Sequence, residues 1–531
     1  MKKKWIKLIL GGWILFLVLT NIIWLYLDKL PPAWDSAAHL KSIVLVNQGL
    51  RGQFEGSFKE LLGSFWGYPP LVYFLGGAWG LITGLKIDTL VFLNTIFLVG
   101  VIFGVYKLAK EIVKEEKVAI ISVIIFSLFP VVGEISRSML LDLPLLVWVV
   151  WGLYFWLKSE DLKITKYAWG LLIMLVLASL TKLNGFLYFI PIGILILIKG
   201  FKDINIWLKL MIGGVFYGVA VGWWWLLNWN NIYQYLTGLA GQGEKLTDPM
   251  NLGQWQTWIH YFKLLFLHQI GPITTILLLV FGWFVPKSRE NKKVIWWTII
   301  VYVIFTIIKN KDFRFTLPIL IPMAIWLGWG LIEFGKKISK NIAVIIMVLS
   351  LIWLGFNFWE NAFSWPIKKP LVISTKSLLF EDIDWVGFDD YPVRSVNQEI
   401  WPVETIINDL IIETDNKLTV NMLGLIDLEE LNNSNLNLYK LMLDRNEINI
   451  ETLGGITKEF KQEEIREIVN INNYFLVPEE NYEAAPFYVT HLKVNNQFRD
   501  WIWENIIEFE VIREYQLPNQ KKIYLLKKME M

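Results

Sequence analysis

Side chains that could carry chemistry stand in short polar segments between long apolar runs of this sequence. Asp35 and His39 follow the first apolar run, and Asp142 ends a polar turn that begins at Glu134. A carboxylate can accept a proton from an attacking hydroxyl or hold a divalent ion, so Asp35 and Asp142 suit a group-transfer reaction. The alternative for Asp35 is structural, because Asp is a preferred N-cap of a helix. The two roles are compatible.

Cationic side chains occur at the ends of apolar runs, at Lys182 and in Lys311-Asp312-Phe313-Arg314, and Arg137 lies in the polar turn that begins at Glu134. Arg presents a fork of N–H donors and Lys a point charge, so such residues could bind a phosphate group. The alternative for Lys182 and Arg314 is that they reach toward lipid headgroups. The alternative for Arg137 is an interfacial ion pair with an acid of the same turn.

The composition excludes several classes of protein. Of the 531 residues, 55% are hydrophobic, and the mean hydropathy is +0.45. This is too apolar for an ordinary globular enzyme, so lipid must be the solvent for most of the chain. A net charge of +2 gives no basic excess for binding nucleic acid. The absence of Cys excludes disulfides and a thiolate nucleophile, and four His argue against a multi-histidine metal site.

Apolar runs of membrane-spanning length fill the first two thirds of the chain. The run from Trp5 to Leu27 follows three lysines and can cross about 30 Å of hydrocarbon, so we interpret it as a retained anchor that starts in the cytoplasm. The stretch 67–84 is short and is predicted to be a re-entrant or interfacial helix within an outer loop, 28–88. Further spans are predicted near 89–108, 118–133, 143–157, 167–181, 183–199, 207–228, 261–285, 294–308, 316–334 and 341–357, which makes about eleven transmembrane helices.

The distribution of lysine predicts the orientation of these helices. Cytoplasmic loops collect Lys and Arg, and the loops that this scheme places inside all carry lysine. The N-terminus is therefore expected in the cytoplasm, and everything after Asn357 outside the plasma membrane. Residues 1–357 are predicted to form a helical transmembrane domain, and the charge-rich residues 358–531 a soluble α/β domain. In the latter we expect strands at 417–424 and 474–478, a helix at 435–443, and a hairpin of 508–515 with 521–526.

The polar segments occur in an order that resembles the GT-C glycosyltransferases of the dolichyl-phosphate-mannose protein mannosyltransferase and aminoarabinose transferase type. The resemblance covers about residues 1–335. It rests on five segments: Asp35-Ser36-Ala37-Ala38-His39, Tyr68-Pro69-Pro70-Leu71, Arg137 with Leu141-Asp142-Leu143-Pro144, Thr181-Lys182-Leu183-Asn184-Gly185, and Arg314-Phe315-Thr316-Leu317-Pro318.

The resemblance implies a polyprenyl-phosphate-linked sugar as donor and an inverting transfer at the outer membrane surface. A protein, lipid or glycan would be the acceptor. It implies that Asp35 is the base or an acceptor-orienting carboxylate and that Asp142 is its partner. It also implies that Lys182, Arg314 and Arg137 bind the donor phosphate and that His39 and Tyr68 position donor or acceptor.

Two positions depart from the pattern of this family. Ser36 stands where a second acidic residue is expected, and Tyr68 stands where a histidine is expected. The first departure leaves open whether a divalent cation is required.

Two other functions remain as alternatives. A transporter or flippase for a lipid-linked glycan should carry ionisable residues at mid-membrane depth, whereas the centres of these spans are nearly free of them. A catalytically silent assembly protein with a GT-C-like fold is the other alternative, because Ser36 replaces an expected acid.

Overall fold

The chain folds into two compact units, which this computed structural model describes separately. The first, the helical unit, comprises Met1–Tyr26, Glu55–Gly76 and Val91–Val396, and the second, the α/β unit, comprises Leu27–Phe54, Gly77–Leu90 and Asn397–Met531. The structure describes residues 3–529 except 66, 238–250, 364–372, 377–381, 387–394, 415–419, 446, 452, 454–459 and 481–488. The sequence predicts a single boundary after residue 357, whereas the C-terminal segment of the α/β unit starts at Asn397, and the unit also includes two parts of the first outer loop.

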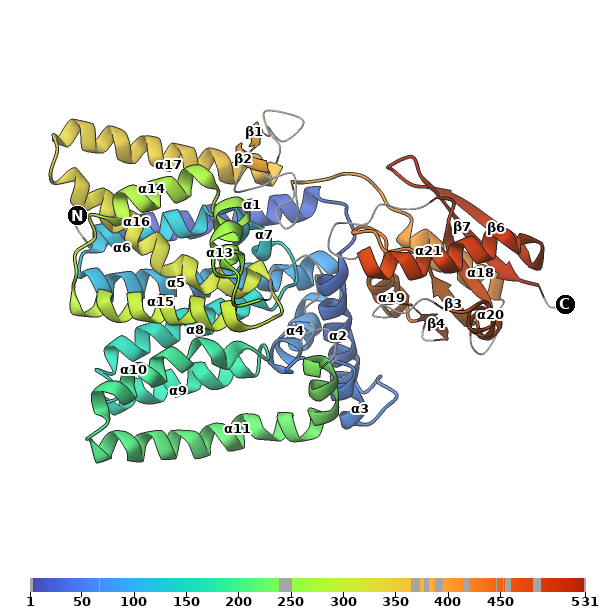
Figure 1. Cartoon of the computed structure of the whole chain (residues 1–531), viewed down its shortest axis with the longest axis horizontal. Coiled ribbons are helices and arrows are strands. Elements are labelled where there is room, and N and C mark those ends of the chain that lie inside the picture. The colour runs from blue at the N-terminus through green and yellow to red at the C-terminus, as the bar shows by residue number, and fades with distance from the viewer. Residues whose placement is uncertain are drawn as a thin grey trace. The chain divides into compact units, whose positions relative to one another are not determined.

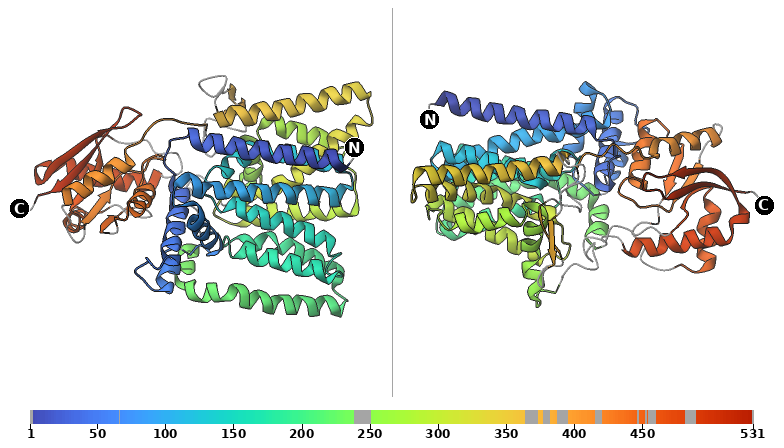
Figure 2. Two further views of the ribbon diagram at one scale, coloured as in Figure 1. Left: turned by 180° about the vertical axis from the view of Figure 1, so that it is seen from behind. Right: turned by 90° about the horizontal axis from the view of Figure 1, so that it is seen from above.

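Long apolar helices that run roughly side by side form the helical unit (Figures 1 and 2). Within the described residues, five helices are long and apolar enough to cross a membrane. They are α1 (Lys3–Leu27), α5 (Ile87–Val113), α11 (Ile204–Thr237), α16 (Leu320–Gly335, preceded by the 3-10 helix η3, Phe313–Ile319) and α17 (Lys340–Phe363). The prediction of a polytopic helical membrane protein is confirmed.

Two further candidate spans are broken by a bend. Helices α6 (Glu116–Ser127) and α7 (Pro130–Ser136) meet at 69°, and the pair α13/η2 (Trp255–Leu264, Leu265–Gln269) meets α14 (Pro272–Gly282) at 117°. A proline begins the second helix of each pair, where its missing N–H costs nothing, and it prevents the preceding helix from continuing. The sequence predicts one continuous span at each place, at 118–133 and at 261–285.

The remaining predicted spans coincide with shorter helices. These are α8 (Asp142–Lys158), α9 (Thr165–Ser179), η1 with α10 (Gly185–Tyr188, Ile190–Gly200) and α15 (Arg289–Ile307). The expected total of about eleven crossings stays a prediction, because the long helices and bent pairs among the described residues give up to seven. The predicted re-entrant stretch forms α4 (Leu71–Thr83).

The α/β unit is built on a five-stranded sheet with the order β4-β3-β5-β7-β6. Strand β3 is parallel to β4 and β5, and β7 is antiparallel to β5 and β6. The strands are β3 (Val420–Gly424), β4 (Ile448–Glu451), β5 (Tyr474–Pro478), β6 (Phe509–Gln516) and β7 (Lys522–Lys528). The predicted strand 474–478 and C-terminal hairpin are therefore confirmed; of the predicted strand 417–424, the first three residues lie outside the described residues.

Helices cover both faces of this sheet because alternate side chains of its central strand point to opposite sides. Tyr474 and Leu476 pack with α18 (Val403–Thr414) and α19 (Asn433–Met442), while Phe475 and Val477 pack with α20 (Gln462–Ile471) and α21 (Val489–Glu504). The predicted helix 435–443 corresponds to α19.

Two parts of the first outer loop, Leu27–Phe54 and Gly77–Leu90, fold with the C-terminal domain as one unit. The loop's helix α2 (Trp34–Leu50) packs against α19. The Trp34 Nε1–H donates to Asp427 Oδ1 at 2.8 Å, and the Asn397 N–H donates to Asp28 Oδ1 at 3.0 Å. No local pattern in the sequence predicts this long-range pairing.

A separate structural pair in the helical unit, β1 (Ile373–Lys376) and β2 (Asp382–Val386), is an antiparallel ribbon. In the sequence it lies between α17 and Val396, where the helical unit ends. No site residue predicted from the sequence falls on it.

Close packing of α14 on α16 at Gly330 gives a prediction for stability. A Cβ atom at Gly330 would lie 2.0 Å from the backbone oxygen of Phe281, so Gly330→Ala must push the helices apart, at a cost of about 1–3 kcal/mol. We expect the midpoint of thermal unfolding in detergent, followed by circular dichroism, to fall by several degrees. Gly282→Ala is the control, because a Cβ there meets nothing within 4 Å; equal midpoints for the two variants would contradict this account.

Candidate functional site

A buried ion pair joins the start of α8 to the turn after α9. The Lys182 ammonium donates to Asp142 Oδ1 at 2.8 Å, and both side chains are almost fully buried. Within the described part of the chain, Asp142 Oδ2 accepts no hydrogen bond. The pair therefore keeps one buried acceptor atom available at the end of a helix bundle.

The turn that carries Lys182 is fixed by tight backbone packing. The Lys182 N–H donates to the Ala178 oxygen at 3.1 Å, and the Gly185 N–H donates to the Lys182 oxygen at 2.8 Å. A Cβ at Gly185 would lie 2.1 Å from the same Ala178 oxygen, so only glycine allows the chain to fold back here. The Thr181 hydroxyl accepts a hydrogen bond from Trp148 at 2.9 Å.

A second ion pair lies at the start of η3. Arg314 donates to Asp312 Oδ2 through Nε at 2.8 Å and Nη2 at 2.6 Å, and the Arg314 backbone N–H donates to Oδ1 at 2.8 Å. Burial by itself would raise the pKa of Asp312, but the charges of Arg314 and Lys182 and the hydrogen bonds from Arg314 outweigh it and lower this pKa to about 2. Asp312 is therefore ionised at neutral pH.

The two ion pairs form one group of charges, which we call the ion-pair cluster: Asp142, Lys182, Asp312 and Arg314. The Lys182 ammonium lies 5.7 Å from the centre of the Phe315 ring, one residue beyond Arg314. The Tyr188 hydroxyl donates to the Phe315 oxygen at 2.8 Å and so ties η1 to η3. The structure thus brings together three of the residues that the sequence singled out, from segments far apart in the chain.

Arg137 makes its contacts elsewhere in the helical unit. Its Nε donates to Asn21 Oδ1 at 3.1 Å, and its guanidinium lies 5.7 Å from the Trp24 ring and 5.2 Å from the Phe358 ring. Burial lowers the pKa of Arg137 to about 10, an effect that Glu134 partly offsets, so the residue stays charged at neutral pH. None of the contacts described for Arg137 involves the ion-pair cluster.

Asp35 and His39 lie on α2, in the α/β unit. Asp35 is half-buried in the first turn of the helix, and His39 is buried one turn later. The N-cap of α2 is Ala33, so the interpretation of Asp35 as an N-cap is wrong. The carboxylate still lies where the dipole of the helix favours a negative charge. Tyr68, in the helical unit, is half-buried in the loop before α4.

The described residues offer little for a metal ion. No group of three or more His, Asp or Glu side chains lies close enough to hold one in this part of the chain. A site built from two carboxylates of the ion-pair cluster would have to displace Lys182 and Arg314. We therefore assign no chemical step to a metal.

Two residues of this site were missed in the sequence analysis. Asp312 holds Arg314 in place, and Tyr188 links two of the segments that carry the cluster. The spacing of Asp312 two residues before Arg314 was a usable signal, because a carboxylate in that position can cap a helix and pair with the cation at once. Tyr188 gave no signal, since a tyrosine in an apolar helix is common.

The fold and the motifs define a class of protein. Residues 52–238 match the family model described as dolichyl-phosphate-mannose-protein mannosyltransferase. The structure of ArnT from Cupriavidus metallidurans in the apo state is similar, with a TM-score of 0.54 and 11% identity, over 97% of this chain and 98% of that chain. The predicted resemblance to the GT-C glycosyltransferases is confirmed, and the chain has the GT-C fold.

Further relatives are consistent with this class. ArnT from Cupriavidus metallidurans bound to undecaprenyl phosphate has a TM-score of 0.52 and 12% identity, over 97% of this chain and 98% of that chain. The oligosaccharyltransferase of Archaeoglobus fulgidus in the apo form has a TM-score of 0.50 and 11% identity, over 90% of this chain and 70% of that chain. An uncharacterised protein of Aquifex aeolicus (strain VF5) is 26% identical over 319 residues, which are 57% of this chain and 62% of that protein's length.

These findings describe a multi-pass membrane protein with the GT-C fold. At such low identities the solved structures show the fold alone. The sugar, the acceptor and the roles of single residues are matters for proposal.

The low pKa of Asp312 predicts a pH-dependent contribution to stability. A carboxyl group whose pKa falls on folding stabilises the folded state above its unfolded pKa and loses that contribution as the pH drops through the folded pKa. For Asp312 the ordinary value of 3.8 falls to about 2. Its contribution, on the order of 2 kcal/mol, is therefore complete above about pH 4 and lost toward about pH 2.

We expect Asp312→Asn to lower the thermal midpoint of the purified protein at neutral pH, and the difference from wild type to shrink as the pH falls from about 4 to about 2. Glu467→Gln, an exposed position on α20, is the control and should follow the wild type throughout. A difference that stays constant over this range would show that the Asp312 carboxylate is not stabilised by its pairing.

Proposed function

We propose that this protein transfers a sugar from a polyprenyl-phosphate donor to a protein, lipid or glycan acceptor at the outer face of the plasma membrane. The observation that carries the proposal is the ion-pair cluster, in which two cations are buried at the ends of apolar helices. Lipid penalises such charges by a few kcal/mol each, so their presence calls for a function.

Lys182 and Arg314 would bind the donor phosphate. Among its described contacts, Lys182 uses one of its three ammonium protons, on Asp142, and the others can be donated to phosphate oxygens. Asp142 and Asp312 hold the two cations in place before the donor arrives, so little reorganisation is needed during the reaction. The predicted contribution of Arg137 stays a prediction, and its contacts with α1 and α17 favour a structural role.

The reaction needs one base and no acid. An acceptor hydroxyl attacks the anomeric carbon from the side opposite the phosphate, and the bond from that carbon to the phosphate oxygen breaks with inversion. The hydroxyl proton passes to Asp35, and the polyprenyl phosphate leaves with its new negative charge balanced by Lys182 and Arg314. His39, four residues after Asp35 and on the same side of α2, would orient the reacting groups, as would Tyr68.

Replacing the proposed base gives the most direct test of the transferase function. We expect Asp35→Asn to reduce transfer by a factor of about 100 or more, because a positioned base contributes roughly that much. The measurement is the release of undecaprenyl phosphate from its sugar-linked forms in proteoliposomes that contain cell-envelope acceptors, with membrane insertion checked by protease protection.

Glu55→Gln is the matched control, since Glu55 is an exposed carboxylate of the same outer loop, and it should keep full activity. A transporter or a silent assembly protein would be indifferent to both changes. Equal activity of Asp35→Asn and Glu55→Gln would therefore exclude Asp35 as the base.

The role of the two cations is testable by binding alone. Lys182→Gln and Arg314→Gln should each weaken the binding of undecaprenyl phosphate about tenfold or more, because a charge-assisted hydrogen bond contributes about 1.5–3 kcal/mol. Native mass spectrometry of the protein in nanodiscs measures the affinity. Lys59→Gln, an exposed lysine on α3 (Phe58–Gly63), is the control.

Removal of Lys182 also leaves a buried carboxylate without its partner, which can destabilise the fold. The double variant Asp142→Asn with Lys182→Gln removes both charges and separates the two effects. If this double variant binds undecaprenyl phosphate as tightly as wild type, Lys182 does not bind the phosphate.

A further inference from the structure

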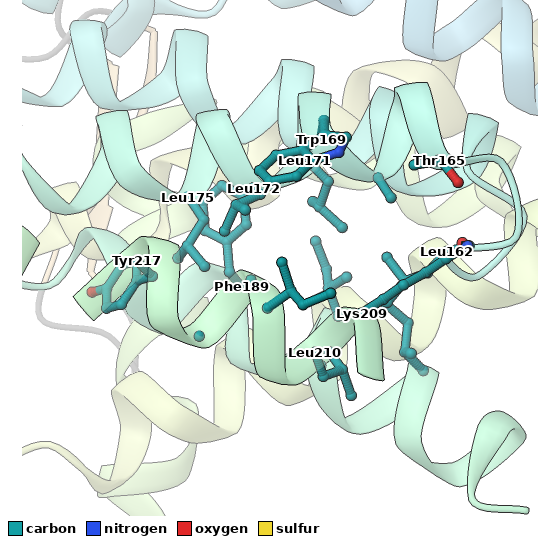
Figure 3. Close-up of a pocket in the computed structure, with 17 residues that line it drawn as sticks. Leu162, Thr165, Trp169, Leu171, Leu172, Leu175, Phe189, Lys209, Leu210 and Tyr217 are labelled. Atoms are coloured by element: carbon teal, nitrogen blue, oxygen red, sulfur yellow. The ribbon is translucent and has the colours of Figure 1, made fainter. Parts of the chain in front are cut away.

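An apolar groove runs between α9, α10 and α11 in the helical unit (Figure 3). Its volume is about 480 Å³, within the range of about 300–1,000 Å³ that is usual for ligand sites. Leucines of α9 and Phe189 line the groove, and the glycines at positions 193, 213 and 214 add no side chain that would fill it. In a bilayer an apolar space of this kind is filled by hydrocarbon, because water would find too few polar partners there.

One end of the groove carries an excess of positive charge. Lys209 reaches across this end and donates to the Leu162 oxygen at 2.7 Å. The neighbouring Asp161 carboxylate is surrounded by three cations: Lys293 at 2.7 Å, Lys199 at 3.6 Å and Arg289 at 3.9 Å. One negative charge thus faces three positive charges beside Lys209, which makes this end complementary to an anion.

At the other end of the groove a hydrogen bond links two helices. The Tyr217 hydroxyl of α11 hydrogen-bonds to the Ser179 hydroxyl of α9 at 3.1 Å. Figure 3 shows Tyr217 at one end of the groove and Lys209 with Thr165 at the other. Lys182 follows the Ser179 end of α9, about 20 Å along the helix from Thr165, so the charged end of the groove is distinct from the ion-pair cluster.

We propose that this groove holds one acyl chain of an acidic phospholipid, whose headgroup lies against Lys209 and the cations around Asp161. The acyl chain fills the space between α9 and α11 and so supports α11, because only 11% of the residues in the apolar stretch of this helix are buried within the protein. The headgroup phosphate balances the surplus of positive charge. This site is independent of the proposed sugar transfer and is tested by bound lipid rather than by activity.

Filling the groove tests where the acyl chain lies. A Cβ at Gly193 meets nothing within 4 Å, and one at Gly213 meets only Leu172 methyl groups at ordinary contact distance. The backbone therefore accepts a side chain at both positions, and Gly193→Leu with Gly213→Leu places two side chains in the groove. We expect the purified double variant to carry about tenfold less phosphatidylglycerol than wild type, because even two displaced methylene groups change affinity by about that factor. Lipid extraction with mass spectrometry measures it.

The matched control is Gly218→Leu, which lies on α11 outside the groove and whose Cβ also meets nothing within 4 Å. It should retain the wild-type amount of phosphatidylglycerol. A second variant, Lys209→Gln, tests the headgroup: it should lower the preference for phosphatidylglycerol over phosphatidylcholine in vesicles that contain both, whereas the exposed Lys107→Gln should not.

Three results would overturn the proposal. The first is that wild-type protein carries no phosphatidylglycerol above the level of its detergent micelle. The second is that Gly193→Leu with Gly213→Leu carries as much phosphatidylglycerol as wild type. The third is that the lipid lost by this double variant is undecaprenyl phosphate. The last result would assign the groove to the tail of the sugar carrier. Loss of sugar transfer on Asp35→Asn is expected in either case, so the failure of one proposal does not imply the failure of the other.

Discussion

A charged side chain buried among apolar helices keeps its charge only if an opposite charge lies within hydrogen-bonding distance. This constraint organises both ends of the helical unit. Asp142 with Lys182 ties α8 to the turn after α9, and Asp161 with Lys293 ties the turn before α9 to α15. Each pair joins segments that are far apart in the sequence, so the pairing that neutralises the charges also fixes the helices relative to one another. The same constraint holds Lys182 in the position from which it would bind a phosphate.

The second ion pair extends this principle to the start of η3. Asp312 accepts three hydrogen bonds from Arg314 and has its pKa lowered to about 2 despite its burial. A carboxylate that is held ionised in this way orients the guanidinium before any ligand arrives. Such preorganisation suits a reaction whose leaving group is a phosphate, because the protein then needs to supply positive charge and one base rather than an acid. The replacement of an expected acid by Ser36 is compatible with a single-base mechanism.

Helix α2, which carries the proposed base Asp35, packs on the C-terminal domain. Trp34, next to Asp35, donates a hydrogen bond to Asp427, and α2 packs along α19. The position of Asp35 therefore depends on the fold of a domain that begins more than 350 residues later in the sequence. A change in the packing of the C-terminal domain on α2 would therefore move the proposed base.

The sequence by itself determined the features that depend on local pattern. The length of the apolar runs predicted the helices, the short apolar run at 474–478 predicted β5, and the turn at 517–520 predicted the hairpin of β6 and β7. The order of its motifs predicted the GT-C fold. Only the tertiary structure revealed the bends at Pro130 and Pro272, the pairing of Asp312 with Arg314, the separate environment of Arg137 and the union of α2 with α19. These features depend on which distant segments of the chain meet. Hydrophobic periodicity and the placement of charges indicate that a face is buried, but they do not indicate which segment covers it.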